Sequence, residues 1–453
     1  MSAATDIDAN GFESTARVRA SLARRHAAER RFRLVGLVAI LLGLGFVAIL
    51  FASILAKGLP AFWQANIRLA VHFDPAIVKI APFPQQQAGQ SSAAHEADIL
   101  AWRTELAGVN WGRLIENALI AVLPPEAAQR RRDVSRLVTS GERFKLRDLV
   151  AANPEIIGHT IEMDLLADAN VDVWVKGNID RTLGDAQLML TPVQRNYVAV
   201  LQEKGLLTQK FATGLFTNVD SRSSLASAGL AGAFIGSLYM MLIVIFLSVP
   251  VGVAAAIYLE EFAPKNRLTD LIEININNLA AVPSIVFGLL GAAVFISWLR
   301  LPLSAPLVGG LVLTLMTLPT VIIATRSTLR AIPPSIRQAA IGLGASRVQT
   351  VSHHVLPLAI PGILTGAIIG VAQALGETAP LLLIGMSAFV ANVPATPLDQ
   401  STALPVQIYL WQGNELRNFF EARTSAAIIV LLALMVMLNG LAIFLRRRFE
   451  KRW

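Results

Sequence analysis

The chain has 453 residues, of which 54% are apolar and only 15% are charged, and its mean hydropathy is +0.56. Soluble proteins carry about 25% charged residues, so the composition excludes an ordinary soluble protein. The net charge of +8 does not indicate nucleic-acid binding, because the basic residues form no aromatic-interleaved patch and no zinc-finger spacing. The lack of cysteine excludes disulfides and Cys-ligated metals.

Six uncharged windows are long enough to cross a bilayer, for which about 20 apolar residues suffice. They predict an all-α polytopic membrane protein with six transmembrane helices. The first window follows a cluster of arginines and is too long for a signal peptide, so we interpret it as a retained anchor. The windows are 34–56, 223–259, 274–299, 301–325, 355–376 and 424–445.

The excess of Lys and Arg in alternate short loops predicts that both termini are cytoplasmic. This orientation gives a multi-pass membrane protein with one long extracytoplasmic insert and an otherwise compact membrane core. The expected parts are a cytoplasmic segment (1–33), the first span (34–56), the insert (57–224), the transmembrane core (225–445) with a cytoplasmic loop (326–354), and a basic cytoplasmic tail (446–453).

The insert at 57–224 contains no internal repeat and no catalytic constellation. Its helical periodicity is plausible for 98–123, 133–138 and 191–204, while 171–175 alternates as a short strand does. The polar stretch 85–92 is typical of a linker. We therefore expect an α+β extracytoplasmic insert between spans one and two.

Prolines interrupt three hydrophobic windows, at Pro250, Pro283 and Pro319. Membrane helices tolerate such residues because neighbouring helices and waters satisfy the freed backbone groups. Two interpretations stay open at this stage. The prolines are either packing kinks or breaks in helices that line a transport path.

The loop between spans four and five predicts a short helix, a turn and a second helix. Ser335 with Gln338 three residues later is the pattern of a capping box. Gly344 provides the left-handed conformation that ends the first helix, and Pro357 marks the return to the membrane. An ordinary amphipathic loop helix between spans is the alternative.

This loop resembles the coupling motif of ABC-importer permeases, which reads Glu-Ala-Ala, three residues, Gly, nine residues, a hydrophobic position, one residue and Leu-Pro. In that family the loop docks into a cleft on a cytoplasmic ATPase. Gln338 stands where the family usually has Glu, and His354 where it usually has an aliphatic residue. The residues that the resemblance assigns to the coupling loop are Ser335, Arg337, Gln338, Ala339, Ala340, Gly344, Leu356 and Pro357.

Two further stretches, 282–289 and 374–382, are similar to the phosphate-specific permeases, and the second is most similar to their A-type subunits (PstA). Many relatives have Arg four residues before the Glu of the second stretch, where this chain has Gln373. The resemblance implies that the translocation path is lined by Ser284, Gln373, Glu377 and Thr378.

Glu377 is a carboxylate within a hydrophobic region, which is costly and indicates function by default. With Gln373 and Pro380 it follows the i, i+4, i+7 spacing of one helix face. Beside an oxyanion it would pair with a basic group, accept a hydrogen bond from protonated phosphate, or be protonated itself. A purely structural carboxyl is the alternative. Arg326 fits a snorkelling arginine better than an anion site, and His353 and His354 lack the spacing of a metal site.

No G-x-x-x-x-G-K-[ST] motif occurs in the sequence, so ATP hydrolysis must come from another subunit. We expect no catalytic residue, no metal and no cofactor on this chain, and ATP–Mg on the partner. The resemblance implies a phosphate importer of the bacterial inner membrane, with a PstC-like permease, a dimer of PstB-like ATPases, a PstS-like phosphate-binding protein and membrane lipid. Import of sulfate, molybdate or phosphonate is the alternative, as is a membrane sensor with an extracytoplasmic ligand domain.

Overall fold

The structure of the protein is a computed structural model that describes residues 5–86, 90–179, 181, 185, 188–221, 224–387, 390 and 392–449. The chain divides into two units, residues 1–56 and residues 57–453. The first unit holds most of helix α1 (Thr5–Gly58), a single helix of 54 residues. The polar stretch expected at 85–92 and the basic tail at 446–453 lie partly outside the described residues.

Five helices are long and apolar enough to cross a membrane within the described ranges, or six if one bent pair counts as a span. The long helices extend over Arg24–Phe62, Ala231–Phe262, Pro306–Ala331, Arg347–Gly376 and Arg417–Arg448. The third hydrophobic window is not one straight helix, since α10 (Arg267–Ala280) meets the next helix at 101°. Pro283 stands at this bend, because it has no N–H and disfavours the helical conformation of the residue before it.

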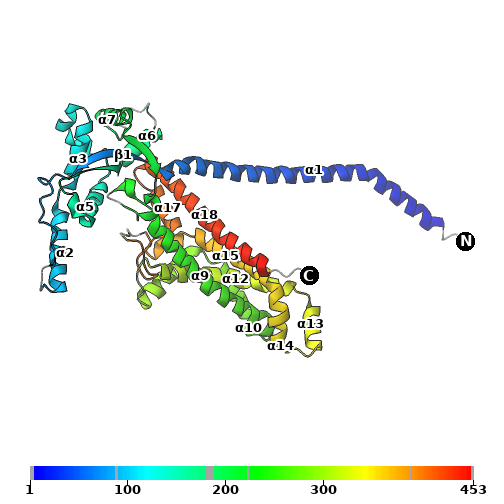
Figure 1. The fold of residues 1–453 in the computed structure, drawn as a ribbon. Coiled ribbons are helices and arrows are strands. Elements are labelled where there is room, and N and C mark those ends of the chain that lie inside the picture. The colour runs from blue at the N-terminus through cyan, green and yellow to red at the C-terminus, as the bar shows by residue number, and fades with distance from the viewer. Residues whose placement is uncertain are drawn as a thin grey trace. The chain divides into compact units, whose positions relative to one another are not determined.

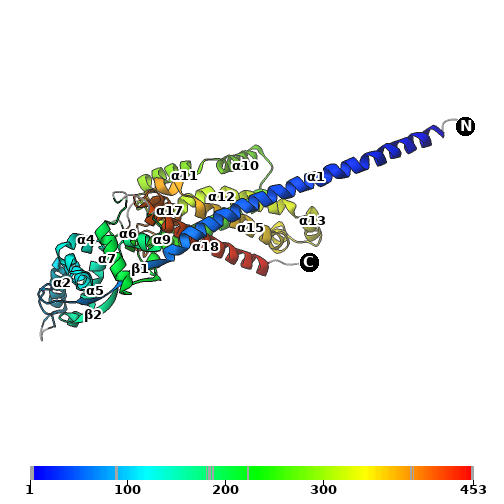
Figure 2. The same cartoon turned by 90° about the horizontal axis from the view of Figure 1, so that it is seen from above.

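The segment after α1 begins with an antiparallel sheet in the order β2-β1-β3. Central strand β1 (Trp63–His72) pairs with β2 (Thr160–Leu166) from Asn66↔Leu166 to His72↔Thr160, and with β3 (Leu207–Phe211) from Trp63↔Phe211 to Ile67↔Leu207. Helices surround these strands (Figure 2). They are α2 (Ser92–Gly108), α3 (Trp111–Val122), α4 (Arg131–Ser135), α5 (Glu142–Ala152), α6 (Ala169–Lys176), α7 (Pro192–Glu203) and α8 (Gly214–Thr217).

Burial of one face of β1 gives this segment a hydrophobic core of its own. Ile67, Leu69 and Val71 alternate with exposed neighbours, and β1 packs against α3, which in turn contacts α5. The expected strand at 171–175 is wrong, because these residues form α6. Asp168 caps this helix by accepting a hydrogen bond from the N–H of Asn170 at 3.0 Å, and Gly177 ends it in the left-handed conformation. Local alternation of apolar residues did not reveal these two end signals.

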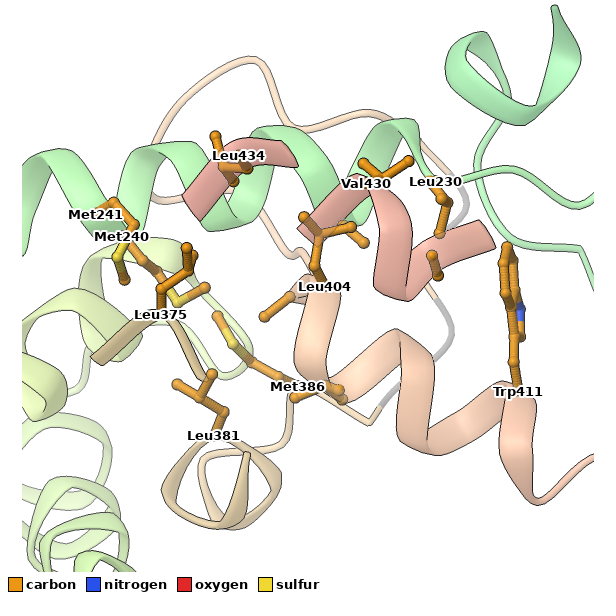
Figure 3. Packing of buried hydrophobic residues seen from close by; sticks show 14 of the residues in the cluster. Leu230, Met240, Met241, Leu375, Leu381, Met386, Leu404, Trp411, Val430 and Leu434 are labelled. Atoms are coloured by element: carbon orange, nitrogen blue, oxygen red, sulfur yellow. The ribbon is translucent and has the colours of Figure 1, made fainter. Parts of the chain in front are cut away.

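Helix α12 (Pro306–Ala331) is the centre of the membrane part, between α9 (Ala231–Ile257) and α15 (Leu356–Gly376). Small residues let the helices approach closely, as is common in membranes. A Cβ on Gly366 would lie 2.4 Å from the Cβ of Ala324. At the end of the membrane part nearer the sheet segment, buried side chains of α9, α16 (Ala379–Leu383), α17 (Leu404–Gln412) and α18 (Arg417–Phe449) pack together, as Figure 3 shows.

A polar junction connects the sheet segment to α18, and Figure 1 shows the beginning of β1 near the start of α18. The guanidinium of Arg423 is buried and donates to the carbonyl oxygens of Ala226 and Ala228. Beside it Asp172 accepts from the N–H of Ala65 at 2.8 Å and from Lys176 Nζ at 2.6 Å. Burial lowers the pKa of Lys176 from its ordinary value, and Asp172 opposes this shift. The three charged side chains of this junction, Arg423, Asp172 and Lys176, are thus all hydrogen-bonded.

Candidate functional site

The predicted coupling loop forms the expected helix, turn and second helix. Helix α13 (Pro334–Gly342) is terminated by the turn at Gly344, whose φ of +89° is the left-handed value expected from the sequence. The N–H of Ala345 donates to the carbonyl of Ala340 at 3.1 Å, and that of Gly344 donates to Ile341 at 2.9 Å. These two bonds are the pattern of a glycine-ended helix. A π-helix at 351–355 then leads into α15.

The capping box lies one helix later than the sequence pattern predicts. Ser335 is inside α13 and makes no cap, because Pro333 occupies the cap position. The box forms instead at α14 (Arg347–Thr350), where Ser346 Oγ accepts from the N–H of Gln349 at 3.2 Å and Gln349 Oε1 accepts from the N–H of Ser346 at 2.9 Å. This loop contains two helix starts, at Pro333 and at Ser346, and the sequence pattern alone does not show which of them forms the capping box.

The coupling loop is attached to the membrane helices by Arg337. Its guanidinium contacts Glu261 at 2.6 Å and 3.2 Å, and donates to the carbonyls of Ile332 and Leu329 at 2.9 Å each. Glu261 lies in the π-helix Tyr258–Phe262 that ends α9. A small hydrophobic cluster beneath the loop adds Ile336 of α13 to residues from the ends of α9, α12 and α15. Helix α13 is therefore packed against the ends of three membrane helices at once.

The opposite side of the loop is exposed. Leu343, at the turn, is almost completely exposed, and Ile341 and Val348 on either side of it are exposed too. Gln338 and Ala339 lie on the same open part, whereas Ala340 is buried and Leu356 and Pro357 are half-buried at the start of α15. Exposed apolar residues on a turn with this rigid attachment are typical of a docking surface for a protein partner. The sequence reasoning did not single out Leu343.

Arg326 is not a snorkelling residue at the end of a span. Its side chain is mostly buried and pairs with Glu260 at 3.3 Å and with Glu273. Glu260 also accepts from Arg330 at 3.0 Å. Because two carboxylates neutralise Arg326, it is not a free cation for an anionic substrate. Glu260 follows α9 and Glu273 lies in the middle of α10, so only the tertiary structure reveals this pairing.

The helical conformation is interrupted at Glu377, between α15 and α16. Helix α15 ends at Gly376, and Glu377 is extended, with φ −74° and ψ 131°. The expected common helix face of Gln373, Glu377 and Pro380 is therefore wrong, because the helix stops before Glu377. Across the described residues no ion pair or hydrogen bond joins the Glu377 carboxylate to another side chain. Its carboxylate and Thr378 are half-buried, while Gln373 is exposed.

The second break lies next to the first. Ser284 begins α11 (Ser284–Gly291), directly after the bend at Pro283. Helix α11 packs against α16, where a Cβ on Gly288 would lie 2.7 Å from the Cα of Pro380. Two discontinuous helices thus meet in the membrane part, and such breaks are where transporters place substrate groups. Of the four residues predicted for the path, Ser284, Glu377 and Thr378 belong to these two breaks.

No group of three or more His, Cys, Asp or Glu suited to a metal ion occurs among the described residues. His353 Nδ1 lies 3.2 Å from the carbonyl oxygen of Gln349 and 3.0 Å from Ser352 Oγ. This imidazole is therefore engaged with its own helix.

Residues 248–453 match the family described as binding-protein-dependent transport system inner membrane component, and residues 19–185 match a domain of unknown function (DUF3333). The second match covers most of the sheet segment, for which the sequence resemblance gave no relative.

Among curated proteins, the chain is 31% identical over 229 residues to the phosphate transport system permease protein PstA of Yersinia pestis, covering 50% of this chain and 76% of the relative. It is 34% identical over 244 residues to PstA of Mycobacterium leprae, covering 53% and 73%. It is also 34% identical over 171 residues to the probable ABC transporter permease protein YqgI of Bacillus subtilis, covering 37% of this chain and 56% of that relative. An inward-facing structure of the MetNI methionine ABC transporter is similar with a TM-score of 0.40 and 17% identity, over 49% of this chain and 96% of that one.

Proposed function

Because this chain belongs to the binding-protein-dependent transport system inner membrane components, the permease subunits of ABC importers, we propose that it imports inorganic phosphate. The family implies a multi-pass inner-membrane protein that works with a separate ATPase and a substrate-binding protein. The observation that carries the proposal is the coupling loop, whose exposed turn at Leu343 is tied through Arg337 to the ends of the membrane helices. Identity to the PstA proteins supports phosphate as the cargo.

In the proposed assembly the chain pairs with a PstC-like permease, PstB-like ATPases and a PstS-like phosphate-binding protein. ATP–Mg binds to the ATPases, and this chain binds no cofactor. Closure of the ATPases moves the residues Ser335–Pro357, and Arg337 passes the motion to α9 and α12. Six spans with both termini cytoplasmic, and the sheet segment 57–224 on the opposite side, complete the arrangement. Opening alternates from one side to the other around the two helix breaks.

The orientation has a direct test, because the chain contains no cysteine. Arg347→Cys introduces one thiol on the exposed side of α14. In right-side-out vesicles we expect a membrane-impermeant maleimide to label it only after the membrane is opened. Leu100→Cys, on exposed α2, is the control that should be labelled in intact vesicles. Labelling of both positions from the same side would refute the proposed coupling.

The cargo is tested with the complete importer in proteoliposomes. We expect ATP-dependent uptake of labelled phosphate that excess phosphate suppresses and that sulfate and molybdate do not. Suppression by sulfate or molybdate, with phosphate ineffective, would show that the importer carries another oxyanion. A chain that purifies in mild detergent without an ATPase subunit would contradict the permease assignment itself.

Within the path we propose that the Glu377 carboxylate accepts a hydrogen bond from a protonated phosphate oxygen. An unpaired carboxylate at one of the two helix breaks, with Arg326 already neutralised, supports this role. Glu377→Ala should abolish uptake and Glu377→Gln should change its pH dependence, with the complex intact. Glu415→Gln, on an exposed loop, is the matched control. Unchanged uptake across pH in both Glu377 variants would reduce this residue to a structural role.

A further inference from the structure

Four aromatic rings form a connected row at the base of the sheet segment. The rings of Phe62 and Phe216 stack with centroids 5.9 Å apart, and those of Phe216 and Phe211 stack at 6.1 Å. Trp63 meets Phe211 edge to face at 6.0 Å. The row therefore runs Phe62–Phe216–Phe211–Trp63 and joins residues distant in sequence.

The aromatic row lies at the level where the chain leaves and re-enters the membrane part. Phe62 closes the short 3-10 helix Leu59–Phe62, which packs against α18 directly after α1 ends at Gly58. At the other side, Phe216 belongs to α8, where the carbonyl of Leu215 accepts from the N–H of Leu230 at 2.7 Å. Helix α9 begins at the next residue. Two membrane helices thus have their ends beside the row.

The row is left uncovered, although its neighbours on the same sheet face are buried. Trp63, Phe211 and Phe216 are 45%, 53% and 44% exposed. Trp63 and Phe211 are register partners, and two residues along β1 on the same face Ala65 is fully buried. The helices that cover this face therefore end before the row. Leu59 is exposed at the same level, and Lys57 pairs with Glu421 at 2.7 Å beside it.

Other exposed aromatic side chains of the sheet segment have a different setting. Phe144 is exposed to the same extent as Phe216, but Arg143 and Arg147 lie over its ring at 4.9 Å and 5.3 Å. Phe83 stands edge to face on the buried Trp102. The row at the base is the one that adjoins the membrane helices.

We propose that this aromatic row lies in the headgroup region of the bilayer and anchors the base of the segment 57–224 to lipid. Aromatic side chains concentrate at membrane–water interfaces, where rings contact acyl chains and polar edges stay hydrated. Here the row adjoins the starts of the apolar helices α9 and α18, and the Lys57–Glu421 pair at its level suits the charged headgroup layer. The anchor would keep the segment at a fixed height above the spans. This inference does not depend on which cargo the importer carries.

The test uses the full importer in vesicles of phosphatidylethanolamine and phosphatidylglycerol. A nitroxide is attached to Phe211→Cys or to Phe216→Cys, and its collisions with oxygen and with a water-soluble nickel complex are compared. We expect the oxygen-to-nickel ratio at both positions to exceed that at the control Phe144→Cys by several-fold. A ratio equal to the control would show that the row is in water, and low access to both reagents would show that protein covers it. Either result overturns the proposal.

A second measurement keeps the row intact. In Trp63→Phe the ring is retained, so the difference between parent and variant isolates the fluorescence of Trp63. We expect lipids brominated near the headgroup to quench the parent more than this variant. Trp102→Phe, which removes a buried tryptophan of α2, should show no such loss of quenching. Identical quenching curves for the parent and Trp63→Phe would contradict lipid contact.

Discussion

Arg337 offers the sharpest test of how the coupling loop is held. Its side chain is 22% exposed and that of Glu261 is 9% exposed, so the pair is partly shielded from water. Arg337→Ala removes the bidentate contact and both backbone hydrogen bonds, and leaves the Glu261 carboxylate without its partner. Truncating one member of a buried, hydrogen-bonded charge pair costs about 2–5 kcal/mol. Because Arg337 is partly exposed, the lower part of that range applies.

A loss of about 2–3 kcal/mol corresponds to about a 30- to 140-fold shift toward a detached α13, since 1.4 kcal/mol is a factor of ten. Local opening is read by amide hydrogen exchange. We expect the amides of residues 335–342 to exchange faster by that factor in the Arg337→Ala importer, and transport per ATP hydrolysed to fall. Arg337→Lys should give an intermediate result, because an ammonium cannot contact both carboxylate oxygens in the same fork.

Two controls separate this effect from a general loss of charge. Arg330→Gln removes a pair whose arginine is 58% exposed, and such surface pairs contribute about 0–1 kcal/mol. The double variant Glu261→Arg/Arg337→Glu restores opposite charges but not the hydrogen bonds to Ile332 and Leu329. It should therefore restore the protection of the α13 amides only in part. If the amide hydrogen exchange of α13 is unchanged in Arg337→Ala, or changes no more than in Arg330→Gln, the reasoning is refuted.

Three further predictions concern other parts of the chain. Arg423→Met should lower the free energy of unfolding by about 2–4 kcal/mol, because two buried carbonyls lose their donor; thermal unfolding checks this, with exposed Arg417→Met as control. Burial raises the pKa of Glu142, so this carboxyl lowers stability as the pH rises above its unfolded value of 4.5 and through its folded pKa. The melting-temperature difference between Glu142→Gln and parent should therefore grow in favour of the variant from pH 4 to pH 7, and a constant difference would contradict this. Gly344→Val should strain the left-handed turn by about 1–2 kcal/mol and weaken ATPase co-purification, whereas helical Gly342→Ala should not.

The sequence by itself determined what depends on local composition and spacing. Uncharged windows longer than a bilayer core located the five long apolar helices. Of the three prolines noted in the sequence, Pro283 stands at a bend, whereas Pro250 and Pro319 lie inside continuous helices. Gly344 was predicted in the left-handed conformation because a helix must end before α14 begins, and its φ of +89° confirms this. The coupling loop could be located in this way because its signals all lie within one short stretch.

Tertiary structure alone decided which charged residues meet. Arg337 pairs with a glutamate 76 positions away, and Arg423 donates to a carbonyl 197 positions away. Whether residues 171–175 form a strand or a helix depended on the helix cap at Asp168 and on packing against β1. Both outweighed the weak alternation of apolar and polar residues. Patterns of period two or 3.6 report only which side of an element is apolar. The partner of a buried charge is set by how the elements pack, because the cost of leaving it unpaired acts on the folded chain as a whole.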